Sequence, residues 1–271
     1  MVNSAVTRPP RIQALARASA IIDVIASGVE EGVGLSDICK VTGLNKTTAF
    51  NLLASLVATR FIEQDVHSRR YQLGLRNLEL GRIVQQRLHI SHLARPVLAD
   101  LCKKTNETVN LGLPDLTDLL VVDSYQGSRL LHATAYHRWR SLYHCTALGK
   151  AFMSQWDAPM RHTVYRLQGL TRQTPRTITD IDILEKHLAQ ARTQGYAIDV
   201  GENEVGVNGI ASSITNGMGE VAAAISVAGH SNRLTEEVME QISMDVVAAA
   251  DAISAALKGD EQAVNRKSGR R

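Results

Sequence analysis

The sequence lacks the features that mark membrane, secreted and zinc-bound proteins. Its 271 residues include only 3 cysteines, and Cys39, Cys102 and Cys145 are far apart and never form a Cys-x-x-Cys pair. Neither a disulfide framework nor a zinc-finger spacing is therefore present. No apolar run reaches the roughly 18 residues that a membrane helix needs, and residues 1–10 contain no apolar export signal. These absences lead us to expect a cytoplasmic protein with reduced thiols.

Charge of neither sign dominates the chain. It has 30 Lys and Arg against 27 Asp and Glu, and hydrophobic residues make up 44%, which excludes a disordered chain and allows one large or two modest domains. The charge is unevenly distributed, because residues 1–90 hold 11 basic and 7 acidic side chains, whereas residues 91–257 hold 14 and 18. This asymmetry predicts that the basic first part meets a polyanion.

Two short helices separated by a glycine turn are predicted in the basic part, after an amphipathic helix that begins near Leu15. Ser36 can cap a short helix that Gly43 ends, and Asn45 is a good N-cap for a helix over residues 46–59. Apolar residues in this last helix share one buried face: Ala49, Leu52, Leu53 and Leu56. The pattern predicts a helix-turn-helix, whose second helix enters the major groove of DNA. The alternative is an all-helical protein that merely contains two helices and a glycine.

The face of helix 46–59 opposite the buried stripe is free to touch DNA. Thr47, Phe50 and Asn51 lie on that face, and Lys46 and Thr48 lie near its N-terminal end. For Phe50, partial burial against the following strands is the alternative to contact with a thymine methyl group. The small polar residues would allow close approach to the groove.

A two-stranded wing is predicted directly after this helix. Residues 61–63 and 69–73 have the composition of short strands, and residues 65–68 have that of a turn. The wing carries Arg69 and Arg70, whose planar, permanently charged guanidinium groups suit contacts with phosphate or with the minor groove. The wing and the basic charge together favour a DNA-binding domain over the all-helical alternative.

Short motifs along the chain resemble, in order, those of the IclR-type bacterial transcription regulators. They include Gly43-Leu44-Asn45-Lys46-Thr47-Thr48, Arg70-Tyr71-Gln72-Leu73-Gly74, Thr146-Ala147-Leu148-Gly149-Lys150-Ala151, Gly195-Tyr196-Ala197 and Glu202-Asn203-Glu204-Val205-Gly206-Val207. The resemblance extends over most of the chain. It implies an α+β protein of two domains: an N-terminal winged helix-turn-helix that binds operator DNA, and a C-terminal α/β domain, similar to the GAF fold, that binds a small-molecule effector. It also implies a homodimer or homotetramer.

The predicted domain boundaries follow from these patterns. Residues 1–10 are expected to be flexible, residues 11–74 to form the winged helix-turn-helix, and residues 75–91 to form a linking helix. That helix can pair two protomers, or alternatively pack within its own chain. Residues 92–257 are expected to form the effector-binding domain, and the polar, basic residues 258–271 to be a disordered tail.

The second domain is predicted to be α/β from its changes of hydrophobic period. Residues 108–113, 119–122 and 221–227 have the composition of strands. Helices are expected at residues 181–194 and 236–257, where apolar side chains keep the spacing of one buried face. Strands mixed with helices favour an α/β layer architecture.

A loop that enters a helix is predicted at Ala147-Leu148-Gly149-Lys150-Ala151, and its free backbone N–H groups could hold a carboxylate. It is no phosphate loop, because His144 stands five residues before Gly149. The resemblance implies that small acids bind at this backbone edge and at side chains of later strands. The corresponding residues here are Ala147, Leu148, Asp199, Gly209 and Ser226. Gly209 stands where many relatives carry a cysteine, which makes the pocket roomier.

Asp199 restricts the class of effector. It would repel a bound carboxylate unless one of the two groups is protonated or Asp199 accepts a hydrogen bond from a ligand hydroxyl. This requirement favours hydroxy-acid, semialdehyde or carbonyl effectors. The alternatives are that Asp199 caps a loop and that Ser226 is an ordinary packed strand residue.

Three histidines raise the question of a metal site. His132, His137 and His144, with Cys145, could bind a metal or form a thiol–imidazole pair. Adjacent strand residues point to opposite faces and no zinc spacing recurs, so we expect no metal and no cofactor.

The sequence as a whole predicts a sequence-specific, effector-controlled transcription regulator that is not an enzyme. Repression is expected by analogy with relatives, with activation of a catabolic operon as the alternative. Two other hypotheses are a small-molecule enzyme or sensor whose basic domain docks protein or RNA, and an architectural DNA-binding protein that needs no effector.

Overall fold

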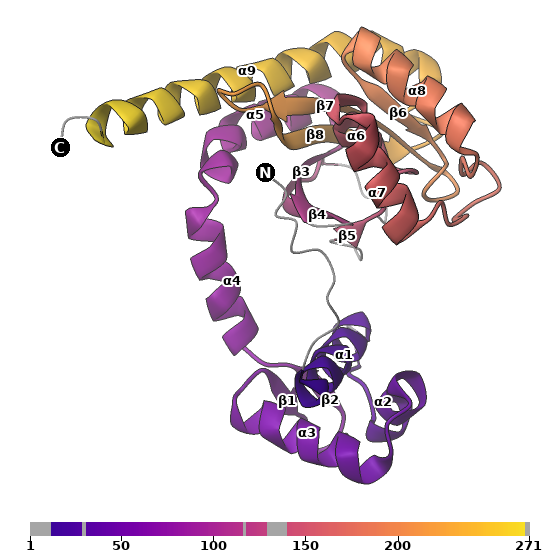
Figure 1. Ribbon diagram of the computed structural model, residues 1–271, viewed down its shortest axis with the longest axis vertical. Coiled ribbons are helices and arrows are strands. Elements are labelled where there is room, and N and C mark those ends of the chain that lie inside the picture. The colour runs from indigo at the N-terminus through magenta and orange to yellow at the C-terminus, as the bar shows by residue number, and fades with distance from the viewer. Residues whose placement is uncertain (1–11, 29–30, 116–117, 129–139, 269–271) are drawn as a thin grey trace. The chain divides into compact units, whose positions relative to one another are not determined.

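The structure is a computed structural model that describes residues 12–28, 31–115, 118–128 and 140–268 (Figure 1). It divides into two compact units, Met1–Arg87 and Leu88–Arg271. Each unit has its own hydrophobic core. Among the described residues, no helix is both long and apolar enough to cross a membrane.

The first unit is a winged helix-turn-helix followed by one further helix, as predicted. Its elements in chain order are α1 (Gln13–Ser27), α2 (Leu35–Thr42), α3 (Lys46–Ala58), β1 (Ile62–Gln64), β2 (Tyr71–Leu73) and α4 (Arg76–Arg87). The fully buried side chains of Ile21, Ile38 and Leu53 bring α1, α2 and α3 into one core. Burial of such aliphatic side chains is the main term that holds three short helices together.

Capping explains where α2 ends and α3 begins. Gly43 adopts a left-handed conformation with φ 69°, which ends α2. Asn45 then caps α3, because its Oδ1 accepts a hydrogen bond from the N–H of Thr48 at 2.8 Å. The expected cap at Ser36 is wrong, since α2 already begins at Leu35 and Gly34 is its N-cap. Helix α2 therefore begins two residues earlier than a cap at Ser36 would place it.

The spacing of Leu15, Ala18, Ile22 and Ile25 predicts one buried face for α1, and the structure agrees with it only in part. Ile21 and Ile25 are buried, whereas Leu15 is 65% exposed. Ile21 and Ile22 are adjacent and equally apolar, so the sequence alone could not fix which of them faces the core. Packing against α2 and α3 made that choice.

The wing is an antiparallel pair in which Ile62 lies opposite Leu73. A third segment joins it, because Val33 and Tyr71 each donate a backbone N–H to the carbonyl oxygen of the other at 2.9 Å. Arg69 and Arg70 were predicted on the returning strand but lie before it, in the turn. The returning strand is therefore two residues shorter than expected, whereas the first strand keeps its expected length of three residues.

The predicted linking segment 75–91 contains the whole of α4 and the start of the next helix. Helix α4 has no buried residue, and its apolar side chains are exposed, including Leu78 at 53% and Val84 at 59%. The helix ends at Arg87, and α5 begins at His89.

The second unit contains one six-stranded antiparallel sheet in the order β5-β4-β3-β8-β7-β6. Its strands are β3 (Thr108–Asp115), β4 (Asp118–Tyr125), β5 (Arg140–Ser141), β6 (Ala197–Val200), β7 (Val207–Thr215) and β8 (Val221–His230). Strands β3, β4 and β8 confirm the three predicted strands. Strands β6 and β7 were missed because small residues and glycine interrupt their hydrophobic pattern.

Helices cover both faces of this sheet (Figure 1). Helices α5 (His89–Thr105) and α9 (Glu236–Ser268) pack on one face, against Ile210 and Ile225. Helices α6 (Ala147–Gln155) and α8 (Ile181–Gln194) pack on the other, against Ala211 and Ala224. Helix α7 (Ala158–Gln168) follows α6. The alternation of large and small side chains along β7 and β8 assigns the opposite faces of each strand to different helices.

The expectation of a disordered tail after residue 257 is wrong in the structure, because α9 continues to Ser268. Residues 258–268 contain no proline and are rich in Ala, Glu, Gln, Lys and Arg, which favour a helix and extend one that has already started. Residues 269–271 lie outside the described part.

Candidate functional site

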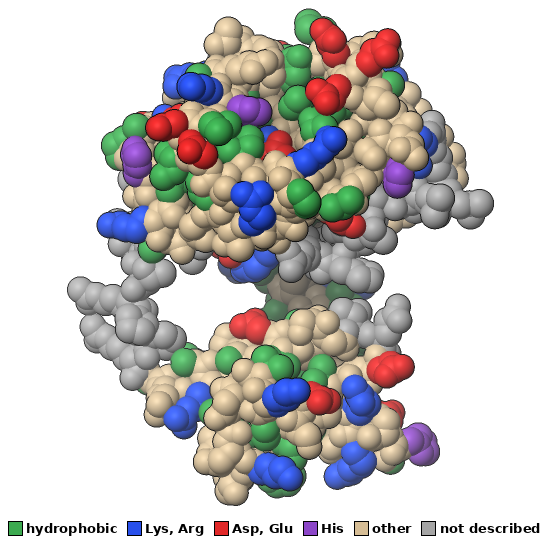
Figure 2. Space-filling model, turned by 90° about the vertical axis from the view of Figure 1, so that its right-hand side faces the viewer, with side chains coloured by type: hydrophobic (Ala, Val, Ile, Leu, Met, Phe, Trp, Pro, Cys, Tyr) green, Lys and Arg blue, Asp and Glu red, His purple; other side chains and the backbone are tan. Residues whose placement is uncertain are grey.

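The predicted DNA-contacting residues of the first unit lie on the outer face of α3. Lys46, Thr47 and Asn51 are exposed, as is 55% of Phe50. Thr48 is half-buried, and its N–H is used by the Asn45 cap. The face opposite the buried stripe is thus open. Figure 2 shows Lys and Arg side chains spread over the visible surface of this unit, among acidic and hydrophobic ones.

The turn of the wing is held by one carboxylate. Asp65 Oδ1 accepts hydrogen bonds from the N–H and hydroxyl of Ser68 at 2.6 and 2.8 Å and from the N–H of His67 at 3.1 Å. These bonds hold the pKa of Asp65 below its ordinary value, and the hydrogen bond from the Ser68 N–H has the largest effect. The turn therefore presents Arg69, which is exposed, from a fixed backbone.

A groove separates α3 from the wing. It has a volume of about 490 Å³ and is lined by the start of α2, by Phe50 and by wing residues that include Arg69 and Arg70. Phe50 faces this groove rather than being buried in it.

In the second unit, the first turn of α6 supplies the expected backbone edge. Thr146 is the N-cap, and its Oγ1 accepts the N–H of Gly149 at 3.0 Å. Within the part of the chain that the structure describes, the N–H groups of Ala147 and Leu148 have no hydrogen-bond acceptor. Such free groups at a helix N-terminus favour an anion.

The other three predicted effector residues lie on the sheet face that α6 covers. Asp199 on β6 lies opposite Gly209 on β7. A Cβ atom added at Gly209 would lie 3.4 Å from Ala147 Cβ, so this part of β7 lies directly below α6. Ser226 on β8 lies opposite Ala211, two residues along the same face. The structure thus brings the five residues to one side of the sheet.

Ser226 and Asp199 are two of the polar side chains on this face. Ser226 is 3% exposed, and its hydroxyl has no hydrogen-bond partner among the described residues. Burial raises the pKa of Asp199 to about 7, an effect that Lys150 opposes and Glu202 reinforces. Asp199 Oδ1 also accepts the N–H of Glu202 at 2.7 Å, so it does cap a loop, as one alternative held.

A buried ion pair next to this site was not predicted. Lys150 of α6 is 2% exposed, Glu202 after β6 is 6% exposed, and Lys150 Nζ donates to Glu202 Oε1. The other oxygen, Oε2, is buried without a hydrogen-bond partner among the described residues. Thr177 Oγ1 donates to the backbone oxygen of Glu202 at 2.6 Å. The sequence signal for this pair was Lys150, a charged residue that stands between the apolar segments Ala147-Leu148 and Ala151-Phe152-Met153.

His144 and Cys145 do not form a reactive pair with each other. His144 Nε2 lies 3.1 Å from the Thr171 oxygen, and the Cys145 thiol donates to Asn203 at 3.7 Å. Burial lowers the pKa of His144 and raises the pKa of Cys145 to about 12, so the thiol remains protonated. In the described ranges, no three His, Cys, Asp or Glu side chains gather to hold a metal ion. His132 and His137 lie outside those ranges.

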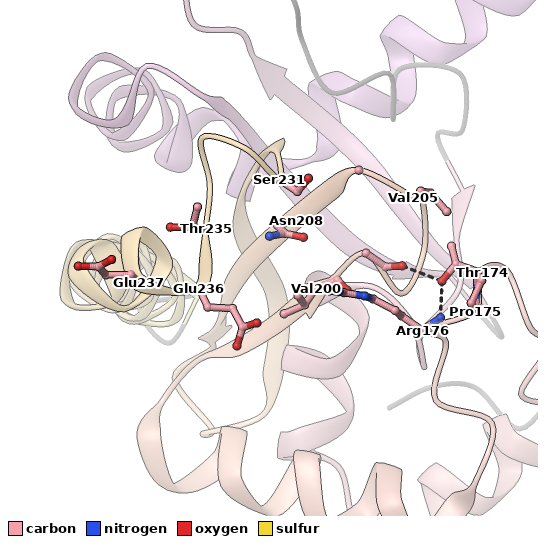
Figure 3. A pocket seen from close by; sticks show the side chains of 12 residues that line it. Thr174, Pro175, Arg176, Val200, Val205, Asn208, Ser231, Thr235, Glu236 and Glu237 are labelled. Carbon is pink, nitrogen blue, oxygen red and sulfur yellow. Dashed lines mark hydrogen bonds between the residues drawn. The ribbon is translucent and has the colours of Figure 1, made fainter.

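A separate hollow of about 720 Å³ lies at the end of the sheet near the start of α9 (Figure 3). Thr235, Glu236 and Glu237 line one side of it, and Thr174 and Arg176 line the other. None of the five predicted effector residues lines this hollow. It is therefore distinct from the face below α6.

A winged helix-turn-helix joined to an α/β domain with a secluded polar face defines a class of proteins, the effector-controlled transcription regulators. Residues 14–66 match the IclR helix-turn-helix domain, and residues 83–255 match the family described as bacterial transcriptional regulator IclR C-terminal. The chain belongs to the IclR family and is a DNA-binding transcription regulator with an effector domain.

Named relatives span nearly the whole chain. This chain is 31% identical over 250 residues to the HTH-type transcriptional regulator XynR of Escherichia coli K12, and the match covers 92% of this chain and 98% of XynR. It is 32% identical over 228 residues to the HTH-type transcriptional repressor AllR of Salmonella typhimurium, covering 83% and 82%.

Solved structures agree with the fold. The IclR of Thermotoga maritima, 27% identical, matches with a TM-score of 0.69 over 90% of this chain and 98% of that one. An IclR homolog of Microbacterium hydrocarbonoxydans, complexed with 4-hydroxybenzoate and 23% identical, matches with a TM-score of 0.75 over 91% and 99%.

Proposed function

We propose that this protein is a repressor whose operator binding or oligomerisation is controlled by a small hydroxy-acid or carbonyl metabolite. The observation that carries the proposal is the sheet face below α6, where free backbone N–H groups, a buried hydroxyl and a buried carboxyl occur together. A relative named as a repressor supports the sign of regulation. Activation of a catabolic operon is the alternative.

The effector's carboxylate is held by the N–H groups of Ala147 and Leu148 at the start of α6. Its hydroxyl or carbonyl oxygen meets Asp199 and Ser226. An Asp199 with a pKa of about 7 can be protonated near neutral pH, when it donates a hydrogen bond and does not repel the anion. Gly209 adds no side chain here, which leaves room for the ligand.

DNA recognition is assigned to α3 and the wing. Lys46, Thr47, Thr48, Phe50 and Asn51 lie at the major groove, and Arg69 and Arg70 belong to the wing that lies along the phosphate backbone. The bases are read by α3, whereas the wing adds affinity that depends little on sequence.

The protein is proposed to act as a homodimer or homotetramer, and not as an enzyme. Leu78, Ile83 and Val84 are exposed apolar side chains on α4, which a second copy of the helix would cover. Paired half-sites in an operator require such a two-fold assembly.

Fluorescence anisotropy on the duplex upstream of the protein's own gene, against a scrambled duplex of equal length, tests this function. We expect a preference of about a thousandfold or more, roughly 4 kcal/mol. Equal, weak binding to both duplexes and to candidate neighbouring promoters would contradict sequence-specific regulation.

A second assay adds 2-hydroxy acids, 2-oxo acids and 4-hydroxybenzoate to the complex with the preferred duplex. Release of the protein supports repression, and tighter binding supports the activator alternative. Asp199→Ala should abolish the response and preserve operator binding. Turnover of an added acid, measured by chromatography, would favour an enzyme instead.

A further inference from the structure

The two adjacent arginines of the wing have different surroundings. The side chain of Arg69 is exposed and makes no hydrogen bond or ion pair within the described residues. Arg70 is half-buried, and its Nε donates to the backbone oxygen of Gly32 at 3.0 Å, in the segment that leads into α2. We infer that Arg70 is a positioning residue that fastens the wing to residues 32–33, and that contact with a DNA phosphate falls to Arg69. The inference rests on the proposed DNA-binding surface and refines it.

The backbone around Arg70 shows why this fastening is specific. Val33 and Tyr71 exchange two hydrogen bonds of 2.9 Å, directly beside the bond between Arg70 and Gly32. Gly32 has a φ of +70°, and a Cβ atom there would lie 2.8 Å from the Tyr71 oxygen and 3.3 Å from Arg70 Cβ. Only glycine fits this conformation and this close approach. The segment is therefore attached to the wing by a backbone pair and by the hydrogen bond from the Arg70 side chain.

The position of the wing matters because a groove of about 490 Å³ lies between it and α3. Gly34 at the start of α2, Phe50 of α3 and Arg70 all line this groove. Recognition needs α3 in the major groove and the wing on the backbone at a fixed separation. Arg70 holds that separation through a guanidinium whose Nε–H direction is rigid, which a flexible lysine does not reproduce.

The salt dependence of DNA binding separates the two roles, and it can be measured on any duplex of fixed length. A lost phosphate contact lowers the slope of log K against log salt by about 0.9. We expect this loss for Arg69→Ala. For Arg70→Ala we expect binding that is about fivefold weaker, the effect of one lost hydrogen bond, with the slope unchanged within about 0.3. Arg70→Lys should behave like Arg70→Ala although it keeps the charge.

Hydrogen exchange gives a readout that a phosphate contact would not move. The amides of Val33 and Tyr71 should exchange faster in Arg70→Ala and at the wild-type rate in Arg69→Ala. Gly32→Ala removes no arginine but disturbs the same attachment, so it should reproduce both effects of Arg70→Ala. The amide of Leu53 in α3 serves as the control for a folded unit.

The inference is overturned if Arg70→Ala loses about one unit of slope with unchanged exchange at Val33 and Tyr71, and if Arg70→Lys restores wild-type binding. If Arg70→Ala unfolds the unit, Arg70→Lys and Gly32→Ala decide by the same two readouts. A wild-type protein that binds no DNA would refute the proposed function, whereas the exchange experiment would still test the attachment.

Discussion

Replacing Lys150 by methionine should destabilise the second unit strongly. Lys150 and Glu202 are 2% and 6% exposed, and the replacement leaves the Glu202 carboxylate buried without its cation. Removal of one partner of such a pair costs about 3–5 kcal/mol, because the remaining charge loses both water and its counter-ion. For a unit of this size, each kcal/mol lowers the midpoint of thermal unfolding by about 2–4 °C. We therefore expect a decrease of about 6–20 °C.

The assay is thermal unfolding of the full chain followed by circular dichroism, with Lys103→Met as the matched control. Lys103 pairs with Asp100, and both side chains are about four-fifths exposed, at 80% and 78%. Exposed pairs contribute about 0–1 kcal/mol, so the control should shift the midpoint by only a few degrees.

The reasoning can be checked further with Glu202→Gln added to Lys150→Met. The double variant no longer buries an uncompensated charge and should recover much of the lost stability. A Lys150→Met midpoint no lower than that of Lys103→Met would refute the argument.

Three other predictions concern the effector site, base recognition and assembly. The folded-state pKa of Asp199 is about 7, above the ordinary value, so its ionisation should lower the stability of the folded chain as pH rises from about 4 to 7. In chemical denaturation, Asp199→Asn should lose less stability than the wild type over that pH window. Thr47→Ala and Asn51→Ala should change which duplex is preferred in competition anisotropy, and an equal loss on every sequence would exclude them as base readers. Val84→Glu places a charge on the exposed apolar face of α4 and should lower the mass measured by analytical ultracentrifugation; an unchanged mass would move the interface elsewhere.

The DNA-binding unit could be predicted in detail because its signals are local. Gly43 and Asn45 act on the backbone within a few residues, so they determine where α2 ends and α3 begins in any context. Ser36 and Leu15 show the limit of this approach. A start shifted by two residues in α2, or a face rotated by one residue in α1, costs little locally, and packing decided both.

The sequence by itself determined the helix-turn-helix and its wing, strands β3, β4 and β8, the open face of α3 and, through ordered motifs, the candidate effector residues. Their proximity depended on strands β6 and β7, which lack a strong local pattern and exist because they pair with each other and with β8. The same is true of Lys150 with Glu202 and of Arg70 with Gly32, which are 52 and 38 residues apart in the chain. Hydrogen bonds and charges act over a few ångströms, so only the folded chain decided which of these distant groups meet.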